Sequence, residues 1–140
     1  MSSYNKFDVT TKDLVDGKHN FASDTFKLML SNTLPTSSNA VKADITEISA
    51  GGGYSAGGTA VTMTVSTSSG TAKVTATNTS LTCTSSTIGP FRYLVIYNDT
   101  QASPVKPLVC WYDYGSALTL NNGDTVNYSF DGTNGLLQLV

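Results

Sequence analysis

The chain contains one histidine, His19, which makes it the first candidate for chemistry. A hydrolase of the Ser-His-Asp class needs such an imidazole as its general base. His19 lies just before the first predicted strand, and we expect it to have a structural role. A glycosidase instead needs two carboxyl groups across a cleft, for which Asp113 and Asp131 are candidates. Their spacing in the sequence gives no sign of that geometry, and we predict no catalytic residue and no enzyme activity.

The sequence also lacks the motifs that hold phosphates or metal ions. Residues 51–58 contain five glycines, but without the GxxxxGKS/T order and without a following helix. No run of closely spaced aspartates ends in a glutamate, as calcium loops require. Cys83 and Cys110 belong to no CxxC pair, which disfavours zinc. We predict no metal and no cofactor, and we expect two buried free thiols on separate strands. A disulfide is the alternative if those strands face each other.

The most unusual segment is residues 110–115, Cys-Trp-Tyr-Asp-Tyr-Gly, in which three aromatic side chains surround an aspartate. Aromatic faces stack on sugar rings, and a carboxylate accepts hydrogen bonds from sugar hydroxyls. Trp and Tyr are equally the usual anchors of a sandwich core or of a protein interface. We favour a core or interface role for Trp111, Tyr112 and Tyr114 over a sugar-binding platform.

The elements that position these residues follow from the alternation of apolar and polar side chains, the two-residue period of a strand. It predicts short strands within residues 25–30, 41–49, 59–66, 72–76, 80–84, 91–97, 108–112, 117–120, 125–130 and 136–140. Residues 91–97 are apolar on both faces and follow a break at Gly89-Pro90. A strand of this kind belongs in the middle of a sheet that is covered on both sides.

Two local features are more specific. The runs at 59–66 and 72–76 predict a β-hairpin, with Val61, Met63 and Val65 facing inward. The one plausible helix is a short turn through residues 12–15, capped by Thr10 or Thr11 and ended by Gly17.

These elements predict an all-β protein: an antiparallel β-sandwich or jelly-roll-like single domain with one short N-terminal helix. The absence of helix-strand alternation excludes a parallel α/β sheet. We expect one domain over residues 1–140, with an N-terminal arm and helix in 1–24 and the sandwich in 25–140.

Composition narrows the function classes. Charged residues make up 13% of the chain, and the formal net charge is -2. Because the Lys and Arg residues are scattered, no basic face is expected for nucleic acid. The N-terminus has no signal-peptide pattern, and no apolar run approaches the roughly 20 residues that span a bilayer. We therefore expect no membrane partner and assembly in the cytoplasm.

Several short segments are distinctive in combination. They are Tyr4-Asn-Lys-Phe7, Gly17-Lys-His-Asn-Phe21, Asp24-Thr-Phe-Lys-Leu-Met-Leu30, Ala43-Asp-Ile-Thr-Glu-Ile48, Gly53-Tyr-Ser-Ala-Gly-Gly58, Gly89-Pro-Phe-Arg-Tyr93, Tyr97-Asn-Asp-Thr100 and Trp111-Tyr-Asp-Tyr-Gly115. Through these segments the chain resembles a group of small structural proteins of tailed-bacteriophage virions, described as capsid decoration (cement) or tail-fibre-like proteins.

The resemblance implies a component of the virus particle. The leading expectation is a decoration protein on the outer capsid surface, which binds the major capsid protein, bridges its subunits and associates as a trimer. Candidate partner contacts are Tyr4, Phe7, Gly53, Tyr54, Trp111, Tyr112 and Tyr114. The alternatives are that the N-terminal arm pairs within its own sheet, that the glycine-rich segment is only a surface loop, and that the aromatic corner is core. A tail or fibre component with a carbohydrate-binding or receptor-binding face is the other reading of the function.

Overall fold

The structure, a computed structural model, describes residues 3–140 and is dominated by antiparallel strands. The strands are β1 (Ser3–Lys6), β2 (Phe26–Ser31), β3 (Thr59–Val61), β4 (Met63–Ser68), β5 (Thr71–Ala76), β6 (Thr79–Thr82), β7 (Thr87–Asn98), β8 (Leu108–Asn121), β9 (Thr125–Tyr128) and β10 (Leu137–Leu139). The helices are α1 (Asp8–Val15) and a 3-10 helix at Lys42–Asp44. The predicted all-β class with a short N-terminal helix is confirmed.

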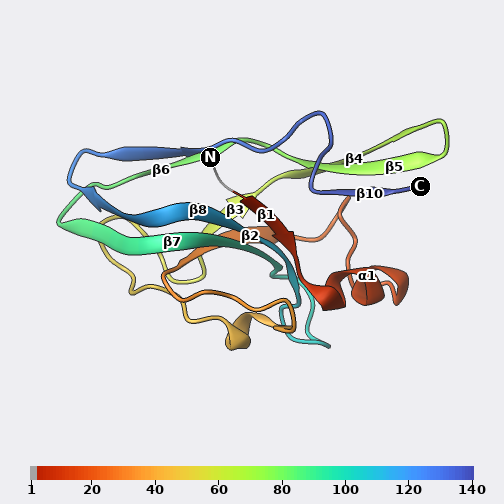
Figure 1. The fold of residues 1–140 in the computed structure, drawn as a ribbon, viewed down its shortest axis with the longest axis horizontal. Helices are drawn as coiled ribbons and strands as arrows, with labels where there is room; N and C mark the ends of the chain where they lie inside the picture. Colours follow the sequence, from red (N-terminus) through yellow and green to blue (C-terminus); the bar gives the residue numbers. More distant parts are fainter. Residues whose placement is uncertain (1–2) are drawn as a thin grey trace.

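The strands form two layers (Figure 1). One layer is a five-stranded sheet in the order β1-β8-β7-β2-β3. The other layer consists of a three-stranded sheet, β10-β5-β4, and the β6-β9 pair. In Figure 1 the three-stranded sheet extends over α1, while β6 and β9 lie at the opposite end. The main core fills the space between the layers.

The five-stranded sheet is covered on both faces, as the pattern of residues 91–97 predicts. Leu28 and Ile96 are register partners in β2 and β7 and belong to the core between the layers. Their neighbours Met29 and Val95 point the other way, into a second cluster with Phe7 and Trp111. The 3-10 helix lies on that second face, where Ile45 packs against the second cluster (Figure 1). β7 is therefore the central strand of the sheet.

The strand predicted at residues 41–49 is wrong. Instead the chain forms the 3-10 helix Lys42–Asp44, flanked by isolated bridges such as Ser31 to Glu47. The Asp44 carboxylate accepts hydrogen bonds from the backbone N–H groups of Ala40 at 2.9 Å and Val41 at 3.2 Å. This local side-chain bonding turns the backbone where apolar alternation alone predicts a strand.

Two predicted chain breaks are also wrong, because each lies inside a long strand. Gly89-Pro90 falls within β7, where the pairing with β8 shifts register between Ile88 and Phe91. Tyr114-Gly115 falls within β8, which joins the two strands predicted at 108–112 and 117–120. Irregular pairing lets both strands bend without ending.

The helix and the hairpin occupy their predicted places with local differences. α1 begins at Asp8, so Thr10 does not cap it; the Thr10 hydroxyl instead donates to the backbone carbonyl of Val109 at 2.6 Å. The β4–β5 hairpin turns at Ser69 and Gly70, both with positive φ. Val65 was predicted to face inward, yet 42% of it is exposed, because this hairpin extends beyond the side chains that fill the core.

Candidate functional site

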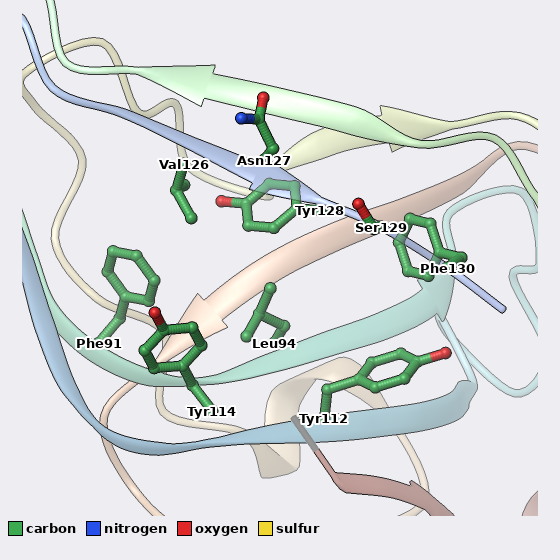
Figure 2. A pocket seen from close by; sticks show the side chains of 9 residues that line it. All are labelled: Phe91, Leu94, Tyr112, Tyr114, Val126, Asn127, Tyr128, Ser129 and Phe130. Atoms are coloured by element: carbon green, nitrogen blue, oxygen red, sulfur yellow. The ribbon is translucent and has the colours of Figure 1, made fainter. Parts of the chain in front are cut away.

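An aromatic pocket lies where β7 and β8 pass beneath β9 (Figure 2). Its lining residues are Phe91, Leu94, Tyr112, Tyr114, Val126, Asn127, Tyr128, Ser129 and Phe130. Figure 2 shows Phe91, Leu94 and Tyr114 rising from the lower strands toward β9. The pocket therefore places two residues of the predicted aromatic corner on one accessible surface.

The volume of this pocket limits what it can hold. It measures about 70 Å³, whereas sites that enclose a small molecule span roughly 300–1,000 Å³. Tyr112 packs edge-on against Phe130, with ring centroids 5.8 Å apart, which closes one end. A ligand would have to rest on the pocket rim, where Tyr114 is exposed, or insert a single side chain.

The predicted contact residues separate into buried and accessible groups. Phe7 and Trp111 pack together with ring centroids 4.6 Å apart and are both buried on the outer face of the five-stranded sheet. Tyr4 lies in β1, opposite Tyr112 in β8, and its ring packs edge-on against the Tyr112 ring at 5.5 Å. The N-terminal arm thus pairs within the chain's own sheet, and Trp111 is core.

The glycine-rich loop is packed onto the domain instead of standing free. Tyr54 is buried, and its hydroxyl donates to Glu47 Oε1 at 2.7 Å, while Gly53 is exposed. Gly58 has φ +84° and lies so close to β2 that a Cβ atom there would be 2.0 Å from the Leu28 carbonyl oxygen. Only glycine fits this approach, so the loop contributes to the fold through Tyr54 and Gly58 and is accessible at Gly53.

The two candidate carboxylates both have structural partners. Asp113 receives two hydrogen bonds from the Arg92 guanidinium at 2.8 and 3.1 Å, and these hold the pKa of Asp113 below its usual range. Asp131 accepts hydrogen bonds from Asn134 and Thr133, which also lower its pKa. A glycosidase requires one carboxyl group that stays protonated as the general acid. Neither aspartate meets that requirement.

His19 is buried in a polar network with Asn98, the last residue of β7. Asn98 Oδ1 accepts the backbone N–H of Thr100 at 2.9 Å, so its amide nitrogen must face Asp24 at 2.8 Å and His19 Nδ1 at 3.3 Å. Burial lowers the pKa of His19 to about 4, outweighing the opposite effect of Asp24. The imidazole is therefore neutral at pH 7. Its Nε2 has no hydrogen-bond partner among residues 3–140.

A larger cleft of about 680 Å³ opens between the three-stranded sheet and α1. Its lining residues are Tyr4, Lys6, Thr10, Thr11, Leu14, Gly17, His19, Asn20, Phe21, Ala22, Val65, Ala72, Val74, Leu136, Leu137, Gln138 and Leu139. The residues predicted from sequence do not define this cleft, because its walls come from both ends of the chain and from the β4–β5 hairpin. The one signal in the sequence is the alternation of Leu137 and Leu139 with Gln138.

The two cysteines are free and buried, so the structure has no disulfide between them. Within residues 3–140, no group of three or more His, Cys, Asp or Glu side chains is placed to hold a metal ion. No helix in the described part of the chain has the length and apolar character needed to cross a membrane.

Comparison of the chain with protein-family models, curated protein sequences and solved structures gave no match.

Proposed function

We propose that this protein is a capsid decoration protein of a tailed bacteriophage, which binds the outer surface of the head and stabilises contacts between major capsid subunits. The observation that carries the proposal is the open apolar cleft beside α1. Apolar side chains exposed there include Val65 and Leu139, with 42% and 59% of their surfaces accessible. Such a surface is typical of a site that another protein covers. The resemblance of the sequence to small virion proteins supports the assignment to a tailed-phage particle.

The proposed mechanism is multivalent binding. Packaged DNA loads the joints between capsid subunits, and a rigid domain repeated at every joint adds buried area without strong individual contacts. The five-stranded sheet, which is covered on both faces, keeps the domain rigid, because most side chains of β2 and β7 are buried. Association as a trimer would match the local three-fold axes of the lattice.

The copy number of the protein in purified particles tests this proposal. Quantitative peptide mass spectrometry should find hundreds of copies, in a simple ratio to the major capsid protein. A handful of copies, or a few dozen, would exclude the decoration role and favour the tail. Absence from the particle would overturn the assignment to the virion.

The aromatic pocket favours a second candidate, a tail or fibre component that binds carbohydrate. Tyr114 is exposed at its rim, and the polar residues Asn127 and Ser129 also line the pocket. A sugar ring could stack on Tyr114 and bond to these polar groups. This function predicts a low copy number and binding to polysaccharide from the host surface, which Tyr114→Ala would abolish.

A further inference from the structure

The roof of the cleft is one face of the three-stranded sheet. The register places Val65, Val74 and Leu137 in one row across its strands. The next row on the same face contains Thr67, Ala72 and Leu139. On the opposite face the row between these two is polar, with Ser66, Lys73 and Gln138. The sheet is therefore amphipathic, and its apolar face overhangs an open space.

The floor of the cleft includes the free edge of β1. β1 pairs with β8 on one side, and no strand within residues 3–140 pairs with its other side. Because Phe7 N donates to Val109 O, the alternation of an antiparallel ladder turns the backbone groups of Tyr4 and Lys6 away from β8. The side chains of these same two residues line the cleft. An added strand beside β1 would therefore bond to Tyr4 and Lys6 and direct alternate side chains into the cleft.

His19 supplies a polar contact for such a strand. It lines the cleft and is 5% exposed, and among the described residues its Nε2 has no hydrogen-bond partner. A buried ring nitrogen without a partner is destabilising in either tautomer of the imidazole. A backbone carbonyl or N–H group of an incoming peptide would satisfy it.

The charges of the cleft also restrict the occupant. Lys6 is the one Lys or Arg among the lining residues, and no Asp or Glu is among them. We propose that the cleft binds an extended segment of the major capsid protein, which adds to β1 as a strand. Its alternate residues are apolar and fill the cleft, and an acidic residue pairs with Lys6. The assignment of the segment to the major capsid protein rests on the proposed function. Its alternating apolar residues and its acidic residue are inferred from the lining of the cleft.

The probes are overlapping 12-residue peptides, labelled with fluorescein, from all abundant proteins of the source particle. We expect the full-length protein to bind peptides of the major capsid protein that carry apolar residues at alternate positions. Lys6→Pro removes the edge N–H group and should weaken binding at least about tenfold. Lys6→Ala keeps that N–H group and should weaken binding by no more than about threefold.

A second pair of variants tests the apolar wall without changing the backbone. Leu139→Asp places a charge in the cleft and should weaken binding at least about tenfold. Leu34→Asp is the matched control, because Leu34 is 61% exposed, similar to the 59% of Leu139, and does not line the cleft. Circular dichroism and the thermal midpoint establish that each variant is folded.

The outcomes separate this proposal from the decoration function. If no particle peptide binds although hundreds of copies are present per particle, the strand addition is wrong and the decoration function stands. Binding of tail peptides alone overturns the capsid segment as the occupant. Self-association of the wild type that Leu139→Asp abolishes makes a second copy the occupant and also overturns the proposal.

Discussion

The Tyr54 hydroxyl donates a hydrogen bond to Glu47 Oε1 at 2.7 Å, which ties the glycine-rich loop to the segment beneath the five-stranded sheet. The same hydroxyl accepts the backbone N–H of Leu30 in β2 at 3.0 Å. Burial favours a higher pKa for Glu47, but the hydrogen bonds from Tyr54, Gly57 and Lys42 outweigh it and lower the pKa. Glu47 is thus an ionised, half-buried anchor of the loop.

Tyr54→Phe should destabilise the protein by about 1–3 kcal/mol, because it leaves the Leu30 N–H group without its partner and removes one of the two hydrogen bonds to Glu47 Oε1. Urea denaturation followed by tryptophan fluorescence measures this change. Tyr114→Phe is the control, since the Tyr114 side chain is exposed, and it should change the free energy of unfolding by less than about 0.5 kcal/mol. Equal effects of the two substitutions would contradict the role of the Tyr54 hydroxyl.

His19 makes stability depend on pH in a defined window. Burial lowers its pKa to about 4 in the folded protein, against about 6.5 in an unfolded chain. The unfolded state therefore binds more protons between these values, so stability is full above pH 6.5 and falls as the pH decreases toward 4. The total loss is on the order of 3 kcal/mol.

The measurement is the free energy of unfolding at several pH values between 7 and 5. His19 is the only histidine in the chain, so His19→Gln should flatten this dependence while lowering stability at pH 7. Asp and Glu residues whose pKa is lowered act at more acidic pH and do not mask the effect. An unchanged slope in His19→Gln would exclude the buried neutral imidazole.

Gly58→Ala should be among the most damaging single substitutions. Gly58 has φ +84°, and an added Cβ would lie 2.0 Å from the Leu28 carbonyl oxygen, so β2 or the loop must move. We expect a loss of more than about 3 kcal/mol in thermal or urea unfolding. Gly115→Ala is the matched control, because its φ is +99° but nothing lies within 4 Å, and it should cost about 1–2 kcal/mol.

The thiols of Cys83 and Cys110 should not react with a thiol reagent in the folded protein. Both side chains are fully buried, and burial raises the pKa of Cys110, which disfavours the reactive thiolate. Titration with a chromogenic disulfide reagent should give two thiols per chain in urea and none without it. Rapid labelling of Cys110 under native conditions would mean that β8, an interior strand of the five-stranded sheet, opens far more readily than its burial implies.

Local pattern predicts much of this fold. Side chains alternate across a strand whatever it pairs with, so the runs around Leu28 and Ile96 are recognisable as strands without any tertiary information. The apolar character of both faces of residues 91–97 likewise predicts the central strand. The turn of the β4–β5 hairpin is also local, since Gly70 adopts a positive φ without strain.

In two places the alternation of apolar residues is an insufficient guide. The 41–49 segment alternates like a strand, yet the carboxylate of Asp44 accepts hydrogen bonds from the neighbouring backbone and a 3-10 helix forms. The break predicted at Tyr114-Gly115 does not occur, because β7 continues to pair with β8 on both sides of it. The first outcome is set by a local hydrogen bond that competes with the strand, and the second by pairing with another strand.

The all-β class, the hairpin, the central strand and the burial of both cysteines are predictable from sequence, because they follow from side-chain periodicity and apolar character. Which aromatic residues are accessible, and where the cleft opens, depend on the tertiary fold. Tyr4 and Leu139 come from opposite ends of the chain and line one cleft. Contacts between such distant residues depend on how the sheets stack, and a pattern of a few neighbouring residues does not predict that stacking.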